Sequence, residues 1–366
     1  MTVVPEDHEA HGATYRELAD GRRAVERYRR PERTATAVRS GVGVIEMGYG
    51  VVEVTGDDRH DFVDDAVSNR VPTTDGEGCY ALLLDPQGAI TTDMYVYNAG
   101  RRLLVFTPPA RAEPLVEDWS GKVFIQDVDI QVASADFGVF GVHGPTSTEK
   151  VASVLNGAGS PDRQCSFVRG SMGDAGVTVV RTDGPLGEEG YEVVCTADAG
   201  GEVFDTLLTR GLNAVPFGYG VFETLALEAG TPLFDTELEG RIPNVAGIRN
   251  ALDFEKGCYV GQEVVSKVEN RGRPSERLVG LLPEALPERS AAVFDGDSAV
   301  GEVTRATASP TLERDAALAY VGIGLDAGAV TVRVDGEEVP AEVIDLPFHE
   351  GSDRSARVPR YPPADD

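Results

Sequence analysis

The chain has 366 residues, with 61 Asp and Glu against 33 Lys and Arg, and carries a formal net charge of −28. This length predicts two or three domains, and a hydrophobic content of 41% supplies each with a core, which argues against a disordered chain. Because so negative a field repels phosphate groups and anionic lipid, we expect neither nucleic acid nor a membrane as a partner.

Lysine is scarce in this chain, at positions 122, 150, 256 and 267, whereas there are 29 arginines. An acid excess with so little lysine favours a halophilic protein, because the Debye length falls to about 3 Å at 1 M salt and self-repulsion is then screened. The alternative is an ordinary acidic cytosolic protein.

The N-terminal 30 residues mix both charge signs, and no apolar stretch reaches the roughly 18 residues that span a bilayer. We therefore expect a cytoplasmic protein, without signal peptide or membrane span, and a monomer. The cysteines are scattered without a CxxC pair, which argues against a zinc ribbon or a disulfide framework, and we expect no metal. They are Cys79, Cys165, Cys195 and Cys258.

Hydrophobic periodicity predicts alternating strands and helices over the first 230 residues. Helices are expected at 14–30, 57–71, 109–121, 146–157, 200–211 and 221–230. Strands are expected at 42–56, 80–109, 123–142, 176–183 and 190–197, with tight turns at DPQG and NAG.

The composition changes near Arg273, where short strands follow one another between Gly, Pro and Asp residues. This pattern predicts a separate small antiparallel β-barrel. The polar, Pro-rich tail after Leu346 is expected to fray.

The segment KGCYVGQE, Lys256–Glu263, is the most specific stretch of the chain. Lys256 lies two residues before Cys258, on the same face of an extended chain, and EVVSKVE is suited to begin a helix just beyond. A nearby cation and a helix N-terminus both lower the pKa of a thiol, which would make Cys258 reactive. The alternative is a glycine-rich loop around a buried cysteine.

Two carboxylates are further candidates. Asp93 in QGAITTDMYVY is either a functional acid or a turn residue. Glu192 in LGEEGYEV lies in a strand, and a buried carboxylate there suits the planar N–H fork of an aminopyrimidine ring. The alternative for Glu192 is a solvent-facing position.

The sequence KGCYVGQEVVSKVENRGRPSERL resembles the signature of the YgfZ-type folate-binding proteins, which are relatives of the glycine cleavage T-protein, an aminomethyltransferase. QGAITTDMYVY, FGVFGVHGP, LGEEGYEV, LALEAGTPLFDTEL and VGEVTRATASPTL resemble further segments of that superfamily. Two positions depart from the T-protein pattern, since Ala226 stands where an Arg is expected and His143 where a Gln is expected. The cysteine of the KGCYVGQE segment separates the YgfZ-type proteins from the T-proteins.

This resemblance implies an α+β, three-domain T-protein-like fold: two interleaved α/β domains around a central folate channel, and a C-terminal antiparallel β-barrel. The implied domains are 1–50 with 130–225, then 51–129 with 226–272, and the barrel at 273–350, with a tail at 351–366. The second is ferredoxin-like.

The resemblance also implies site residues. Tetrahydrofolate is the implied cofactor, with Asp93, Glu192, Tyr191, Glu228 and Gln262 as its contacts. The implied catalytic residues are Cys258, Asp93 and Lys256.

Three functions are open at this point. The resemblance favours a tetrahydrofolate-binding factor in iron–sulfur cluster assembly or repair, with iron–sulfur client proteins as partners and Cys258 as its functional thiol. The alternative is a folate-dependent aminomethyltransferase or related demethylase, in which Asp93 assists one-carbon transfer. A binding module that only senses folate is the third.

Overall fold

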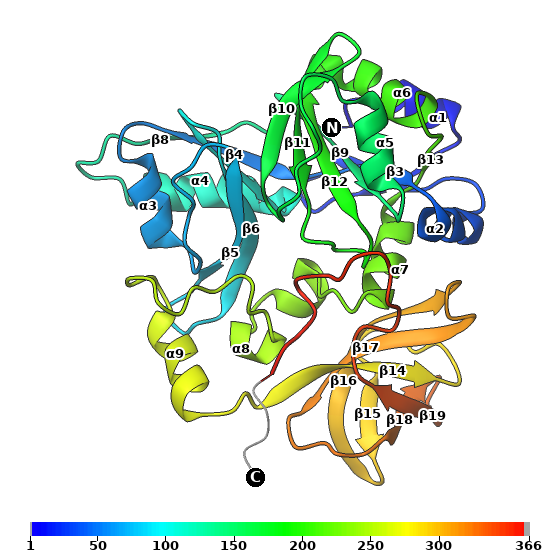
Figure 1. Cartoon of the computed structure of the whole chain (residues 1–366). Helices are drawn as coiled ribbons and strands as arrows, with labels where there is room; N and C mark the ends of the chain where they lie inside the picture. The colour runs from blue at the N-terminus through cyan, green and yellow to red at the C-terminus, as the bar shows by residue number, and fades with distance from the viewer. Residues whose placement is uncertain (1, 362–366) are drawn as a thin grey trace.

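The computed structural model describes residues 2–361 and arranges their strands in four sheets. Figure 1 shows the three larger ones as separate bodies, with the C-terminal segment crossing the middle of the molecule between them. Strands from early and middle parts of the chain share the first sheet, whereas the barrel is built from the last part. The predicted α+β architecture with interleaved parts and a C-terminal barrel is confirmed. The predicted domain bounds stay a prediction.

The first sheet has six strands in the order β10-β11-β12-β9-β3-β13. Its strand β12 pairs with β9 and β11 and is buried on both faces up to its last residue. Helices α5 (Ser147–Val154) and α6 (Gly200–Thr209) pack against this sheet. The strands are β3 (Gly43–Glu46), β9 (Phe137–His143), β10 (Phe167–Met172), β11 (Ala175–Arg181), β12 (Gly190–Thr196) and β13 (Val215–Pro216).

The second sheet has five strands in the order β5-β6-β7-β4-β8. Because side chains alternate along β6, Met94 and Val96 join one hydrophobic core, which includes the fully buried Trp119. Asp93 and Tyr95 lie on the opposite face. The elements are β4 (Gly50–Thr55), α3 (Arg59–Ala66), β5 (Glu77–Leu84), β6 (Ile90–Asn98), β7 (Leu103–Thr107), η1 (Pro109–Arg111), α4 (Ala112–Ser120) and β8 (Asp129–Val132).

The helix predicted at 14–30 is wrong. The segment forms a hairpin of β1 (Thr14–Glu17) and β2 (Arg23–Arg27), turned at Gly21, whose φ of +78° favours glycine. Packing overrides helix propensity here, because Ala24 and Val25 are buried and β2 contacts α7 (Tyr219–Glu228). The sequence also did not indicate α1 (Pro5–Ala10) and α2 (Pro31–Ser40), each of which begins at a proline.

Short helices link the second sheet to the barrel. They are the π-helical η3 (Phe234–Leu238), α8 (Pro243–Ala246) and α9 (Gln262–Arg271), whereas the short η2 (Ala197–Ala199) lies between β12 and α6. The predicted barrel closes in the order β14-β17-β16-β15-β18-β19. Its strands are β14 (Glu276–Pro283), β15 (Ala292–Asp295), β16 (Ser298–Ser309), β17 (Arg314–Gly322), β18 (Ala329–Val334) and β19 (Glu337–Ile344).

The prediction that the tail frays is wrong for residues 351–361, which we call the C-terminal strap. The amide of Ala356 donates to the carbonyl of Asp183 at 2.9 Å, and that of Arg360 to the carbonyl of Gly247 at 2.9 Å. Ser355 and Val358 are buried. Residues 362–366 lie outside the described part of the chain.

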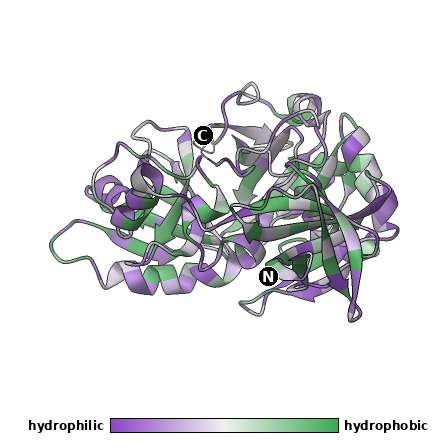
Figure 2. Ribbon diagram, turned by 90° about the horizontal axis from the view of Figure 1, so that it is seen from below, coloured by the Kyte–Doolittle hydropathy of each residue, from purple (hydrophilic) through white to green (hydrophobic). Residues whose placement is uncertain are grey.

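Hydrophobic residues concentrate along the strands and hydrophilic ones on the outer helices, as Figure 2 shows. Within residues 2–361, no helix is both long and apolar enough to cross a membrane.

Candidate functional site

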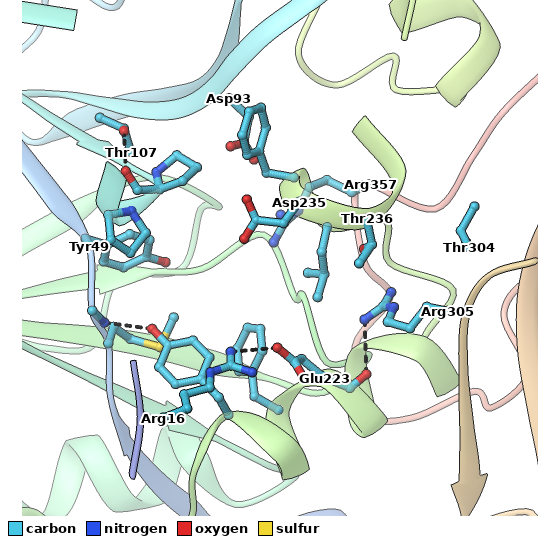
Figure 3. Close-up of a pocket in the computed structure, with 18 of the residues that line it drawn as sticks. Arg16, Tyr49, Asp93, Thr107, Glu223, Asp235, Thr236, Thr304, Arg305 and Arg357 are labelled. Carbon is cyan, nitrogen blue, oxygen red and sulfur yellow. Dashed lines mark hydrogen bonds and ion pairs between the residues drawn. The ribbon is translucent and has the colours of Figure 1, made fainter. Parts of the chain in front are cut away.

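A pocket of about 390 Å³ lies between the five-stranded sheet, helix α7, the barrel and the C-terminal strap. All four contribute to its wall, together with the loop before β4, and Figure 3 shows charged and aromatic side chains that face it. Most of the wall is aromatic or apolar. The residues used below are Tyr49 before β4, Asp93 and Tyr95 on β6, Phe106 on β7, Tyr219 on α7, Asp235 in η3, Arg305 on β16 and Arg357 in the strap.

Asp93 is the predicted site residue that lines this pocket. Its side chain is 8% exposed, and its Oδ2 accepts a hydrogen bond of 2.7 Å from the hydroxyl of Tyr80. Burial raises the pKa of Asp93, while the Tyr80 hydrogen bond and the charge of Arg357 oppose that rise. Asp93 is therefore a buried carboxylate with one oxygen held by a tyrosine, at a pocket wall.

Two tyrosines hold Asp93, which lines this wall, and Asp183, which does not. Tyr80 and Tyr95 are cross-strand partners with ring centroids 5.1 Å apart. The hydroxyl of Tyr95 donates to Oδ1 of Asp183 at 2.8 Å, and Oδ2 of Asp183 lies 3.0 Å from Nε of Arg357. The Arg357 guanidinium stands over the Tyr80 ring, with its carbon 5.1 Å from the centroid.

Asp235 is a second carboxylate at the pocket. Among the described residues no hydrogen bond to its side-chain oxygens occurs, and Figure 3 shows this side chain close to Arg357. Burial raises the pKa of Asp235, and the nearby charge of Glu239 adds to the rise. The sequence analysis did not select Asp235.

Glu192 lies close to the pocket but does not line it. The hydroxyl of Tyr49, which does line it, donates to Oε1 of Glu192 at 2.6 Å and so covers the carboxylate. Burial raises the pKa of Glu192 to about 7, and the Tyr49 hydrogen bond opposes the rise. Glu192 is 4% exposed, so the solvent-facing alternative is wrong.

Comparison with known proteins identifies the family. Residues 4–256 match the GCVT N-terminal domain, and residues 276–350 match the glycine cleavage T-protein C-terminal barrel domain. The chain belongs to the glycine cleavage T-protein family.

Two curated relatives match this T-protein family member over nearly their whole length. The chain is 30% identical to the aminomethyltransferase of Cutibacterium acnes over 364 residues, covering 94% of this chain and 97% of the relative. It is also 30% identical to the aminomethyltransferase of Saccharopolyspora erythraea, covering 95% and 98%. The crystal structure of glycine cleavage system aminomethyltransferase T from Bartonella henselae shares the fold, with a TM-score of 0.85 at 20% identity, over 96% of this chain and 98% of that one.

The KGCYVGQE segment of this T-protein family member does not reach the pocket lining. Cys258 is exposed, whereas Lys256 is buried, so the two side chains do not face the same way. The Lys256 ammonium donates to the carbonyls of Val67 at 2.9 Å and Asn69 at 3.0 Å, just beyond α3. The predicted activation of Cys258 by Lys256 is therefore wrong, because the ammonium is committed to these carbonyls.

Local packing explains the rest of that segment. Gly261 has φ of +81°, and a Cβ on it would approach the carbonyl oxygen of Asp85 to 2.7 Å, so the loop needs glycine where it meets the β5–β6 turn. The side chain of Gln262 donates to the carbonyls of Lys256 and Gly257 at 3.2 and 3.3 Å. Gln262 therefore closes its own loop and does not line the pocket.

The structure likewise places Tyr191 and Glu228 away from the pocket lining. Tyr191 alternates with Glu192 on β12, so it faces the opposite core, where its hydroxyl lies 2.9 Å from that of Thr148. Glu228 is fully buried and accepts hydrogen bonds from Arg39 at 2.9 Å and Ser309 at 2.6 Å. Both residues hold the fold together.

The two departures from the family pattern are buried as well. Ala226 is fully buried in α7 within a hydrophobic cluster. His143 is buried, neither of its ring nitrogens has a partner among the described residues, and burial lowers its pKa to about 3. His143 is therefore a neutral packing residue between Phe217 and Phe222.

Proposed function

We propose that this protein is a tetrahydrofolate-dependent one-carbon transferase of the aminomethyltransferase type. The observation that carries the proposal is Asp93, a carboxylate at an aromatic pocket with Oδ2 fixed by Tyr80. No other side chain among the described residues donates a hydrogen bond to its Oδ1, which leaves that oxygen for a ligand. The match to aminomethyltransferases over nearly the whole chain supports the same function.

The pocket residues fit a reduced folate. Flat rings suit its aromatic wall of Tyr95, Phe106 and Tyr219, while Asp93 and Asp235 offer acceptors for N–H groups. Bound tetrahydrofolate would supply the nitrogen that takes up the one-carbon unit. Asp93 can orient that N–H group and hold the proton that it loses. The new carbon–nitrogen bond would form as the bond between the one-carbon unit and its donor breaks, with the donor as leaving group.

The predicted contact of Glu192 with the pterin ring stays a prediction. It requires Tyr49 to turn aside, because the Tyr49 hydroxyl covers the Glu192 carboxylate. We do not propose folate contacts for Tyr191, Glu228 or Gln262, because none of them lines the pocket.

Titration calorimetry with tetrahydrofolate tests the proposal. We expect saturable heat from the wild type and about tenfold or weaker binding by Asp93→Asn, because a hydrogen bond to a charged acceptor contributes about 1.5–3 kcal/mol. Asp61→Asn is the matched control, since the Asp61 side chain is 92% exposed. Wild-type protein that gives no saturable heat, or equal affinity for both variants, would contradict the proposal.

A second candidate is the support of iron–sulfur cluster assembly or repair expected of a YgfZ-type protein. The exposure of Cys258 favours it, because burial raises the pKa of the thiols of Cys79 and Cys195 to about 12 and that of Cys165 as well. A strain deleted for the gene, complemented with Cys258→Ala, tests this candidate. Full recovery of iron–sulfur enzyme activities would exclude Cys258 as its functional thiol.

We further propose that the protein works as a monomer in the cytoplasm of a halophile. The charge of −28 and the scarcity of lysine support the halophilic setting.

A further inference from the structure

The C-terminal strap extends beyond the matched barrel domain, which ends at residue 350. It is held on both sides of Arg357, by the amides of Ala356 and Arg360 described above. Farther along, the hydroxyl of Tyr361 donates to the carbonyl of Val245 at 2.9 Å and accepts from the amide of Leu278 at 2.8 Å. The backbone of the strap is therefore anchored to the loop after β11, to the α8 region and to the barrel.

Arg357 is the residue that this anchored backbone carries into the pocket wall. Its side chain is 7% exposed, with its guanidinium carbon 5.1 Å from the ring centroid of Tyr80 and 5.9 Å from that of Tyr95. The hydroxyls of these two rings donate to Asp93 and Asp183 respectively. The Arg357 guanidinium thus packs on both tyrosines, the ones that hold Asp93 and Asp183.

The charges around Arg357 point to the same role. Asp183 forms an ion pair with Arg357. The charge of Arg357 opposes the effect of burial on the pKa of both Asp93 and Glu192. A buried carboxylate without a counter-charge is costly, whereas a planar guanidinium is always charged and can stack on rings while it faces a carboxylate. Of the four arginines that line the pocket, Arg16, Arg289, Arg305 and Arg357, it is Arg357 whose charge opposes the rise in the pKa of Asp93.

We infer that Arg357 is a positioning residue, which the C-terminal strap delivers to hold Tyr80 and Tyr95 in place and to balance the charge of Asp93 and Asp183. Its importance for one-carbon transfer rests on the proposed function, but its effect on the charge of the wall does not. Tyr80 from β5 and Asp235 from η3 also face Asp93. Both groups remain in every variant below.

Thermal unfolding without folate, measured at pH 4.5 and pH 7.5 in the same salt, tests the inference. We expect Arg357→Met to lower the melting temperature by several degrees more at pH 7.5 than at pH 4.5, because Asp93, whose pKa is raised by burial, is more fully ionised at the higher pH. Arg357→Lys keeps the charge and should restore most of the loss at pH 7.5. In an Asp93→Asn background, the extra loss at pH 7.5 should shrink.

Arg354→Met is the matched control, because Arg354 is exposed on the same strap. It should melt like the wild type at both values of pH. Equal losses for Arg357→Met at both values of pH would show packing alone and overturn the inference. If Arg357→Met does not fold, the inference requires Arg357→Lys to be nearly normal, and an equally unfolded lysine variant would overturn it.

Folate titration separates this inference from the proposed function. If the wild type binds tetrahydrofolate, Arg357→Met should weaken binding about tenfold at low pH, because Asp93 then protonates more readily, and less at high pH. Wild-type protein that binds no folate would overturn the proposed function, while the melting comparison would still decide the role of Arg357.

Discussion

The pocket wall around Asp93 and the KGCYVGQE loop around Cys258 differ in how their residues are used. The loop is one continuous motif, yet Lys256, Gly261 and Gln262 each have a local structural task. The pocket is assembled from distant segments, and it keeps carboxylates buried at an energetic cost. A conspicuous motif can thus stabilise a fold, while residues that stand out little in the sequence build a site.

The largest expected effect separates the two regions by turnover. If the pocket is catalytic, Asp93→Asn should lower the rate of one-carbon transfer by about 10²–10⁴-fold, the usual contribution of a positioned acid or base. Cys258→Ala should leave the rate nearly unchanged, because Cys258 does not line the pocket. Steady-state rates with an aminomethyl donor measure both, and the reverse pattern would transfer the chemistry to the loop.

A second prediction concerns the stability cost of the pocket. Glu192 has a pKa of about 7 in the fold against 4.5 ordinarily, so its contribution is most favourable below pH 4.5 and is lost as the pH rises towards 7. Glu192→Gln should therefore stabilise the protein at pH 8, by up to about 3 kcal/mol, and much less at pH 5. Urea unfolding at the two values of pH measures this.

Glu288→Gln is the control for that measurement, because Glu288 is exposed. If Glu192→Gln raised the free energy of unfolding equally at both values of pH, the pKa of Glu192 would not be raised by burial and the prediction would be contradicted.

The loop should behave in the opposite way. Lys256→Met leaves the carbonyls of Val67 and Asn69 without their donor and should destabilise the protein by about 1–3 kcal/mol at all pH values near neutrality. Lys267→Met is the control, since Lys267 is exposed on α9. Urea unfolding that finds both variants as stable as the wild type would refute the structural role of Lys256.

The smallest expected effect is shared by both regions. Because 61 acidic residues face 33 basic ones, added salt should screen repulsion throughout the molecule and raise the melting temperature gradually from low to multimolar KCl. Scanning calorimetry across that range gives the curve. A flat or falling melting temperature would remove the halophilic interpretation.

Local patterns were enough to predict most helices and the barrel, because a strip of apolar side chains identifies an element without knowledge of its partner. The helix prediction for residues 14–30 failed because the burial of β2 against α7 decides their conformation, and α7 begins more than 190 residues after β2 in the chain. Asp93 was selected through a resemblance. Asp235 and Arg357 were not, because nothing local to FDTEL or SARVPR indicates that they face the same pocket.

The long separation in sequence between Arg357 and its two acids has a consequence for biosynthesis. Chains emerge from the ribosome N-terminus first, at about 5–20 residues per second, and their early parts fold as they appear. Asp93 and Asp183 are synthesised long before residue 357, so the nascent protein carries these acids without their cation. The wall therefore lacks this cation until residue 357 has been synthesised, and a chain truncated before Arg357 would lack a finished pocket wall.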